Sequence, residues 1–177
     1  MLELRGFATH EASSDLLFEV RRLMDAAFEG EFAEEDWEHT IGGRHVVVTE
    51  DGVIVAHTAV VSRVLTADDR PWRTGYLEGV ATEPSKMGQG LGSLVMAEAS
   101  RIVRGGYELG GLGTGRHHFY ERLGWERWQG PTFAQDGENL IRTEEDDDGV
   151  MVLRFGPSEG LDLTGTLVCE SRPGDDW

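Results

Sequence analysis

The fold of this 177-residue chain is decided by residues 80–92, whose sequence is VATEPSKMGQGLG. This stretch joins a β-rich run that ends near Ala81 to an amphipathic segment, and apolar residues at i, i+3 and i+4 predict a helix over residues 89–104. Three glycines alternate through the expected first turn: Gly88, Gly90 and Gly92. The first backbone N–H groups of a helix have no partner inside the helix, and the helix dipole favours negative charge there. Glycines at this place therefore predict a cradle for a pyrophosphate.

The glycine spacing excludes two common phosphate loops. A Walker A loop ends in Gly-Lys-Ser or Gly-Lys-Thr, whereas Leu91-Gly92 follow Gly90 here. A dinucleotide fingerprint has the spacing G-x-G-x-x-G, whereas this loop has G-x-G-x-G. The structural alternative is that the glycines only allow the helix to pack closely on a sheet. The choice between this alternative and a phosphate cradle depends on the rest of the chain.

Composition limits the class of protein. The length suits a single domain over residues 1–177 with a sizeable core. A lone cysteine, Cys169, excludes an internal disulfide and a metal site of several thiolates, and it fits a reducing, cytoplasmic compartment. No run of 18 apolar residues and no secretion signal is present, so we expect no membrane association.

The charge balance is strongly acidic. Lys and Arg number 16 and Asp and Glu number 33, which gives a net charge of −17. Such a surface repels nucleic acid and attracts cations, although acidity can also serve solubility alone. The six histidines show no metal-binding spacing, and we expect no metal.

Periodicity and turn signals place the elements along the chain. The expected elements are a strand over 2–7, a helix over 16–28 capped by Ser13 or Ser14, a helix over 34–41, strands over 45–49, 53–65 and 72–81, the helix over 89–104, a strand over 107–112, a helix over 116–123, and strands over 125–129 and 149–155. Asp51-Gly52 is typical of a hairpin turn between two of these strands. This order indicates an α/β fold with a mixed, mostly antiparallel sheet flanked by helices.

The glycine loop resembles the acyl-CoA loop of the GCN5-related N-acetyltransferases (GNAT), whose pattern is Arg or Gln, two residues, Gly, one residue, and Gly or Ala. The resemblance implies that the strands over 72–81 and 107–112 splay apart around acetyl-CoA, the co-substrate. It implies cofactor contacts from Val80, Ala81, Thr82, Met87, Gly88, Gln89, Gly90, Leu91 and Gly92. Met87 departs from the pattern at the first place, so one phosphate contact is weakened or supplied from elsewhere, for example by Lys86.

Further stretches resemble one branch of this family, the aminoglycoside 2′-N-acetyltransferases. They are FEGEF at 28–32, DWEHTIGG at 36–43, GYLEGVA at 75–81, YELG at 107–110, Tyr120 with Gly124-Trp125, and RPGDDW at 172–177. The resemblance extends from about Phe28 to Trp177 and is more specific than the glycine loop.

The resemblance implies catalytic roles for two residues. Glu78 occupies the strand position of the base, acting through water, and Tyr120 occupies the position of the acid that protonates the CoA sulfur. A strand N–H near Val80 would polarise the thioester carbonyl. The alternatives are a solvent-facing strand carboxylate for Glu78 and a core aromatic side chain for Tyr120.

The same resemblance implies a cationic acceptor held by carboxylates. The matching positions are Glu31, Asp36, Glu78, Asp147, Asp175 and the free carboxylate of Trp177. Asp147 belongs to the run EEDDDG at 144–149, and the alternative is that this run is only a solvated turn.

The implied function is acetyl transfer from acetyl-CoA to the 2′-amine of an aminoglycoside, hence antibiotic resistance, by a homodimer. Relatives often have a longer loop where this chain has GTGRHH at 113–118, which leaves kasugamycin as another acceptor. The alternatives are acetylation of another small polyamine or amino sugar, and a non-catalytic acyl-CoA sensor, for which Met87 is the only favourable feature.

Overall fold

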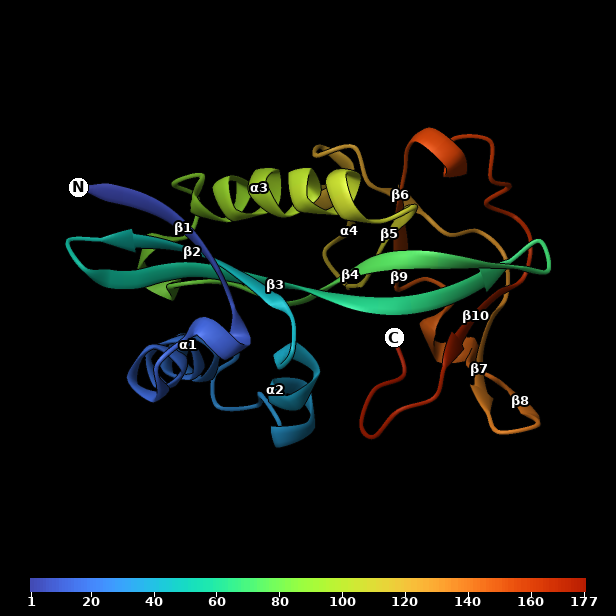
Figure 1. The fold of residues 1–177 in the computed structure, drawn as a ribbon, viewed down its shortest axis with the longest axis horizontal. Helices are drawn as coiled ribbons and strands as arrows, with labels where there is room; N and C mark the ends of the chain where they lie inside the picture. Colours follow the sequence, from blue (N-terminus) through green and yellow to red (C-terminus); the bar gives the residue numbers. More distant parts are fainter. The chain divides into compact units, whose positions relative to one another are not determined.

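Two long strands, β3 (Val53–Ala67) and β4 (Arg70–Thr82), run through most of the computed structural model, which describes residues 1–177 (Figure 1). The chain divides into two units, and β3, β4 and α3 (Leu91–Gly106) contribute to both. The first unit comprises Met1–Val61 and Leu77–Arg101, and the second comprises Ser62–Tyr76 and Ile102–Trp177. None of the helices combines the length and apolar character needed to cross a bilayer.

In the first unit, β1 (Leu2–Ala8) pairs antiparallel with β2 (Arg44–Glu50), and β2 pairs antiparallel with the start of β3. The predicted turn at Asp51-Gly52 is confirmed, because both residues have positive φ, 50° and 85°, as a type I′ hairpin requires. Figure 1 shows α1 (Ser14–Ala27) and α2 (Glu34–Thr40) on one side of these strands and the first part of α3 on the other.

Helix α1 forms as its sequence pattern predicts. The Ser13 hydroxyl accepts a hydrogen bond from the Leu16 N–H at 3.2 Å, which caps the helix. Its apolar face packs on strands of the first unit. The buried cluster consists of Phe7, Val20, Leu23, Met24, Phe32, Val47, Ile54 and Ala81. This cluster spans five elements, β1, α1, β2, β3 and β4, and packs α1 against the end of β4.

Helix α3 begins two residues later than predicted, at Leu91 instead of Gln89. The reason is backbone conformation: Gly88 and Gly90 have φ of +80° and +82°, which a right-handed helix cannot include. A 3₁₀ helix, η2 (Pro84–Lys86), precedes them. Two of the three glycines therefore form the loop itself, and only Gly92 lies in the first turn.

In the second unit the hydrogen-bonded strand order is β6-β9-β5-β4-β3-β10-β7-β8. The new strands are β5 (Leu109–Gly113), β6 (Glu126–Arg127), β7 (Thr132–Asp136), β8 (Asn139–Arg142), β9 (Val150–Arg154) and β10 (Leu167–Glu170). A short helix, α4 (His117–Glu121), and two 3₁₀ helices, η3 (Glu144–Asp146) and η4 (Gly156–Ser158), connect them. The first 3₁₀ helix of the chain, η1 (Thr9–Glu11), belongs to the first unit.

The sequence predicted this second half only coarsely. Strand β6 and helix α4 are shorter than predicted, and the predicted elements include no counterpart of β7, β8 and β10. Strand β10 pairs parallel with β7, and Leu167 lies opposite Thr132. Such a pairing between distant segments depends on tertiary packing and leaves little local signal.

The core of the second unit has no room for a side chain at Gly110 of β5. A Cβ added there would lie 2.8 Å from Cβ of Leu153 and 2.9 Å from the Trp125 ring. We expect Gly110→Ala to lower the free energy of unfolding by about 1–3 kcal/mol, because an overpacked core must shift its neighbours. Urea unfolding measures this loss. Gly160→Ala is the control, because a Cβ at Gly160 meets no atom within 4 Å. Equal stability of both variants would contradict the prediction.

Candidate active site

The candidate base, Glu78, lies on β4 next to a kink in the strand. The parallel register of β4 with β5 ends at the pair Tyr76–Gly111, whereas β4 continues to Thr82. Gly79 has φ of +58°, which L side chains rarely adopt. Glu78 is half-buried at this bend. A residue in left-handed conformation within a strand forms a bulge, which re-aims the side chains on either side of it.

The bulge is packed tightly from the helix side. A Cβ added at Gly79 would lie 3.2 Å from Cγ2 of Thr40 on α2 and 3.4 Å from the sulfur of Met24 on α1. The Gly79 carbonyl accepts a hydrogen bond from Nδ1 of His57 at 2.8 Å. These contacts restrict the backbone conformation of β4 at Gly79.

Three residues predicted to pair with the pantetheine arm follow the bulge. Val80 and Thr82 are half-buried and Ala81 is buried in the α1 cluster. The next N–H, of Glu83, donates to the Val55 carbonyl at 2.9 Å. The strand is thus anchored on the β3 side just beyond the predicted acyl-CoA segment.

The predicted phosphate loop fits an anionic group. Residues 87–90 are exposed, and a Cβ added at Gly88 or Gly90 would meet no atom within 4 Å. Helix α3 follows directly, so its first N–H groups lie next to this open space. The loop therefore offers backbone donors without side-chain obstruction, as a pyrophosphate requires.

Two side chains that precede this loop bear on the missing cation. Met87 is 54% exposed. The Lys86 amine, which the sequence suggested as a substitute, forms an ion pair with the Glu50 carboxylate. Its charge is therefore balanced within the protein.

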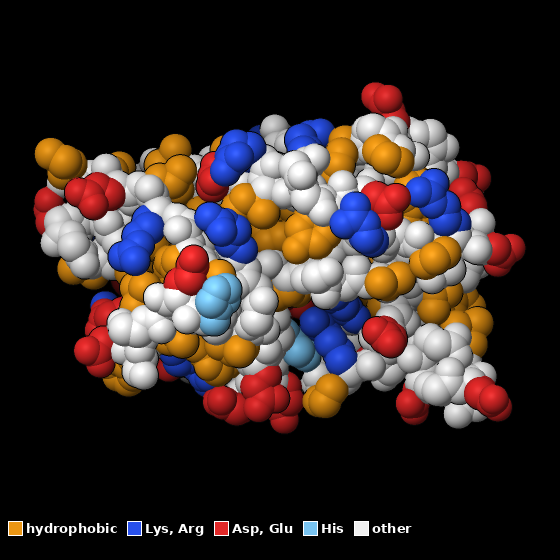
Figure 2. Space-filling model, viewed as in Figure 1, with side chains coloured by type: hydrophobic (Ala, Val, Ile, Leu, Met, Phe, Trp, Pro, Cys, Tyr) orange, Lys and Arg blue, Asp and Glu red, His pale blue; other side chains and the backbone are white.

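The two acidic residues predicted near the acceptor in the first unit differ in their surroundings. Glu31 is exposed between α1 and α2. Asp36 lies in the first turn of α2, and its Oδ2 accepts a hydrogen bond from the Ala33 N–H at 3.0 Å. Figure 2 shows carboxylates gathered over α2, whose first turn contains Glu34, Glu35 and Asp36. This end of α2 presents negative charge to solvent.

The second unit contains the candidate acid, Tyr120 of α4. Burial raises the pKa of Tyr120 to about 12, and a hydrogen bond with Thr114 offsets part of this rise. Its ring contacts Phe119 edge to face, with ring centroids 4.9 Å apart. A phenol with this pKa keeps its proton at neutral pH, which a proton donor must do.

Trp177 is held inside the second unit. Its side chain is 8% exposed, and the indole N–H donates to Oγ1 of Thr143 at 3.0 Å. Oγ1 of Thr143 lies 2.8 Å from Oγ1 of Thr132. A Cβ added at Gly113, at the end of β5, would lie 3.1 Å from the backbone carbonyl carbon of Trp177. The end of the chain therefore lies against the loop that follows β5.

A cluster of carboxylates surrounds Asp146 in the same unit. Burial raises the pKa of Asp146, and the negative charges of Glu145, Asp175, Asp176 and Asp147 raise it further. Asp175 was predicted to bind the acceptor, whereas Asp146 was not singled out within the run at 144–149. Burial is the largest cause of the raised pKa and the neighbouring carboxylates add to it, so a cation bound there would relieve their repulsion.

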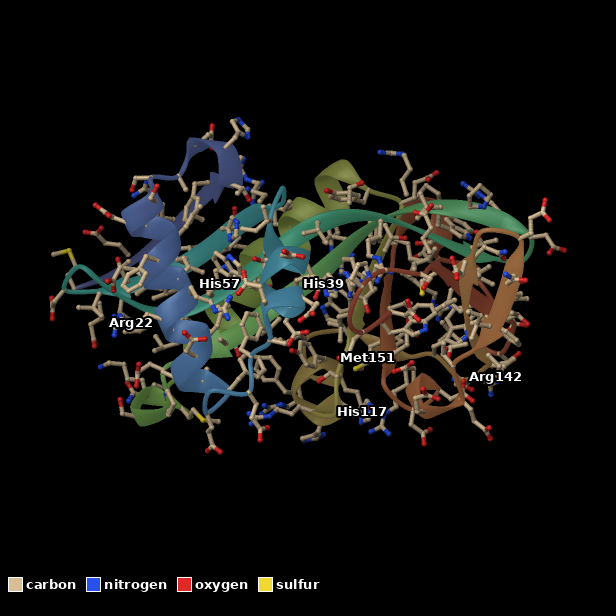
Figure 3. The ribbon with its side chains drawn as sticks, turned by 90° about the horizontal axis from the view of Figure 1, so that it is seen from below. Arg22, His39, His57, His117, Arg142 and Met151 are labelled. Carbon is tan, nitrogen blue, oxygen red and sulfur yellow. The ribbon has the colours of Figure 1, made fainter.

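Asp147 is the predicted acceptor residue whose charge is already balanced. Oδ1 lies 2.7 Å from Nη1 of Arg142 and 2.9 Å from the Thr132 N–H, and Oδ2 contacts Nη2 of Arg142. The Arg142 contact lowers the pKa of Asp147 to about 2, assisted by Thr132. Figure 3 shows Arg142 on β8. Asp147 thus joins β7 and β8 to η3, and Asp146 and Asp175 provide the less balanced charge.

The predicted residues therefore form two groups. In the first unit lie Glu31, Asp36, Glu78, Val80–Thr82 and Met87–Gly92, and in the second lie Tyr120, Asp147, Asp175 and Trp177. Within the second unit, hydrogen bonds through Thr132 and Thr143 connect Asp147 with Trp177. Asp175 belongs to the carboxylate cluster around Asp146. Within the first unit, it places Glu78 and Val80 on either side of the Gly79 bulge.

Comparison with known proteins identifies the class of protein. Residues 9–128 match the acetyltransferase (GNAT) domain family. The chain belongs to the GNAT acetyltransferases. It is 41% identical to aminoglycoside 2′-N-acetyltransferase from Mycolicibacterium fortuitum over 187 aligned residues, which cover 98% of this chain and 95% of that protein. The resemblance inferred from the sequence motifs is confirmed.

Solved structures agree on the fold. A GNAT family acetyltransferase from Brucella melitensis, solved in complex with acetyl-CoA, has a TM-score of 0.64 at 18% identity and covers 94% of each chain. The GNAT protein YhbS from Escherichia coli, solved in complex with CoA, has a TM-score of 0.66 at 16% identity, covering 96% of this chain and 89% of that one. The predicted fold class is confirmed.

Two buried imidazoles near Gly79 give the protein a measurable pH dependence. Burial lowers the pKa of His45 to about 4, and burial together with the charge of His45 lowers the pKa of His57 to about 3. In the unfolded chain both imidazoles are protonated near pH 6.5, so below that pH the unfolded chain binds protons that the folded protein does not bind. We expect the free energy of unfolding to fall between pH 6.5 and 5 by up to about 1.4 kcal/mol per pH unit for each imidazole.

Urea unfolding at pH 7, 6 and 5 measures this slope. The variant His57→Phe retains one of the two imidazoles and should show a shallower slope than the wild-type protein. The same slope in both proteins would contradict the assignment. The window stops at pH 5 because carboxylates begin to titrate below it.

Proposed function

We propose that this protein transfers the acetyl group of acetyl-CoA to the 2′-amine of an aminoglycoside. The observation that carries the proposal is its identity of 41%, over 98% of the chain, to a protein named for that activity. The carboxylate cluster around Asp146 supports a polycationic acceptor, because charge-assisted hydrogen bonds to ammonium groups would offset its mutual repulsion.

Acetyl-CoA would be held by two backbone segments of the first unit. The strand after the bulge, Val80 to Thr82, would pair with the pantetheine arm, and residues 87–92 would bind the pyrophosphate through N–H groups. The bound thioester supplies an activated acetyl group. The open space over Gly88 and Gly90 supports this assignment.

Glu78 and Tyr120 would move the protons. An aliphatic amine is protonated at pH 7 and must lose a proton before its lone pair can attack a carbonyl, and the Glu78 carboxylate takes that proton, directly or through water. The Tyr120 hydroxyl, which keeps its proton at neutral pH, would donate that proton to the departing sulfur. The backbone N–H of Val80 would donate to the thioester oxygen as negative charge develops there.

Acceptor binding is assigned to carboxylates. Glu31, Asp36, Asp175 and the terminal carboxylate of Trp177 would bind ammonium groups, as the family resemblance implies. We add Asp146, whose raised pKa supports a place for a cation. Asp147 is assigned the role of holding this segment in shape through its pair with Arg142.

The finer features of the proposal concern substrate and setting. The short loop at 113–118 lies next to Trp177 and would select among acceptors, so kasugamycin is included beside 4,6-disubstituted aminoglycosides such as gentamicin and tobramycin. We propose a cytoplasmic homodimer whose activity confers resistance.

The proposal is tested by thiol release from acetyl-CoA with a panel of amines. The panel contains aminoglycosides with and without a 2′-amine, kasugamycin and spermidine, and NMR locates the acetyl group on the product. Turnover confined to 2′-amines is expected. Turnover of spermidine alone would indicate a different polyamine acetyltransferase, and tight acetyl-CoA binding without any turnover would indicate a sensor.

Replacing Glu78 tests the assignment of the base. We expect Glu78→Gln to lower kcat by about 10²–10⁴-fold, because the amide cannot accept the amine proton, while acetyl-CoA binding is retained. Steady-state kinetics and calorimetric titration with CoA measure the two effects. Glu31→Gln is the control at an assigned acceptor carboxylate, and it should mainly raise KM for the aminoglycoside. A Glu78→Gln protein with full turnover would overturn the assignment.

Replacing Met87 tests the phosphate loop. Met87→Arg restores a cation at the place where the family pattern has one, beside N–H groups that would bind the pyrophosphate. We expect KM for acetyl-CoA to fall by about 3- to 10-fold at low salt, as a charge-assisted contact to phosphate would provide. The gain should shrink as salt rises. Leu94→Arg, an exposed position on α3, is the control for added positive charge. Equal effects of both variants would contradict a specific phosphate contact.

A further inference from the structure

A row of hydrogen bonds crosses the first unit and ends at the bulge of β4. It begins at the Gly42 N–H, which donates to Oγ1 of Thr9 at 3.0 Å. Oγ1 of Thr9 lies 2.8 Å from Nε2 of His45, and Nδ1 of His45 lies 2.9 Å from Nε2 of His57. Nδ1 of His57 lies 2.8 Å from the Gly79 carbonyl oxygen. Both imidazoles are fully buried.

The last contact determines where every proton in this row resides. A carbonyl only accepts, so Nδ1 of His57 carries the proton and donates it to Gly79. In a neutral imidazole the other nitrogen then accepts, so Nδ1 of His45 donates to Nε2 of His57. By the same reasoning Nε2 of His45 accepts from the Thr9 hydroxyl. Burial lowers the pKa of both histidines far below 7, which keeps them neutral.

We propose that His57, supported by His45 and Thr9, is a positioning residue that holds the Gly79 bulge, and with it Glu78 and the Val80 N–H, in the geometry that acyl transfer needs. The carbonyl of Gly79 points to β3 because His57 bonds it there, and the peptide unit that it belongs to also contains the N–H of Val80. Rotation of this one peptide would therefore turn away the proposed oxyanion donor. The catalytic part of this inference rests on the proposed function.

Three features indicate that the row is more than core packing. Gly79 has the left-handed φ of +58°, which glycine adopts without strain but which interrupts a regular strand, and His57 bonds the carbonyl at this interruption. The other end of the row is Gly42, directly after α2, the helix that contains the proposed acceptor residue Asp36. The Phe7 ring stacks on His45 with centroids 5.2 Å apart, which fixes the imidazole orientation. In Figure 3, His57 on β3 is seen between α1 and α2.

The first test uses the ligand-free wild-type protein and does not depend on activity. Long-range ¹H–¹⁵N NMR at pH 7 reports which imidazole nitrogen carries the proton. We expect His45 and His57 both as the Nδ1–H tautomer, which is the minor form of free histidine, with no titration between pH 8 and 5.5. An Nε2–H tautomer or an imidazolium at either residue would overturn the inference.

The second test separates positioning from stability. His57→Phe keeps the ring but removes both hydrogen bonds, whereas the amide nitrogen of His57→Asn can replace Nδ1 and bond the Gly79 carbonyl. We expect His57→Phe to lower kcat by about 10-fold or more, with KM for acetyl-CoA changed by less than about 2-fold, because misplacing the reacting groups affects the transition state most. His57→Asn should regain most of kcat despite the smaller side chain.

Val20→Ala is the control, because Val20 is buried in the same unit and its side chain has no polar atom that could take part in the row. Denaturant is used to compare the variants at equal free energy of unfolding. If Val20→Ala loses as much kcat as His57→Phe at equal stability, or if His57→Asn is no better than His57→Phe, the residue is structural only and the inference fails. The backbone amide shift of Val80 should move in His57→Phe and return in His57→Asn.

The two proposals can fail separately. If the wild-type protein acetylates no aminoglycoside, the proposed function fails, while the tautomers and the Val80 amide shift still decide whether His57 holds the bulge. If the wild-type protein is active and the tautomers differ from those derived, the proposed function stands and the positioning role is excluded.

Discussion

The left-handed conformation of Gly79 is the constraint on which the first unit depends. A residue at φ of +58° interrupts β4 between Glu78 and Val80, and glycine adopts this conformation without strain whereas L side chains rarely do. Thr40 and Met24 close the space where a side chain would lie, and His57 bonds the carbonyl. The backbone at Gly79 therefore contacts helices α1 and α2 and strand β3, and it adjoins the candidate base Glu78. Both histidines are fully buried, and each ring nitrogen has a hydrogen-bond partner, which offsets the cost of removing it from water.

Electrostatics organise the second unit. Asp146 and Asp147 are adjacent in sequence but lie in different electrostatic surroundings. Asp147 is bound by Arg142 and Thr132, which makes it a structural link with a depressed pKa. Asp146, one residue earlier, is partly buried among Asp175, Asp176 and Glu145, and its pKa is raised. The proposed polycationic acceptor would offset the repulsion among these carboxylates.

Local patterns in the sequence account for most elements of the fold. The Ser13 cap, the amphipathic spacing of α1 and the Asp51-Gly52 turn each act over a few residues, and each is confirmed. The prediction was wrong by two residues at the start of α3, because the sequence does not reveal that Gly88 and Gly90 have positive φ. The sequence prediction omitted the local hairpin of β7 and β8, and it omitted β10, which pairs with β7 more than thirty residues earlier in the chain. Such partners are chosen by packing, which no short window contains.

What the sequence by itself determined is the class of protein and the candidate residues. The family resemblance rests on the glycine spacing, the GYLEGVA segment and the acidic terminus. The comparisons confirm the family. What only the tertiary structure decided is the state of those residues. The balanced charge of Asp147, the unbalanced charge of Asp146 and the pairing of Lys86 with Glu50 depend on which groups folding brings within a few ångströms. The histidine row is of the same kind: Thr9, His45, His57 and Gly79 are far apart in the chain, and only folding connects them into one path of hydrogen bonds.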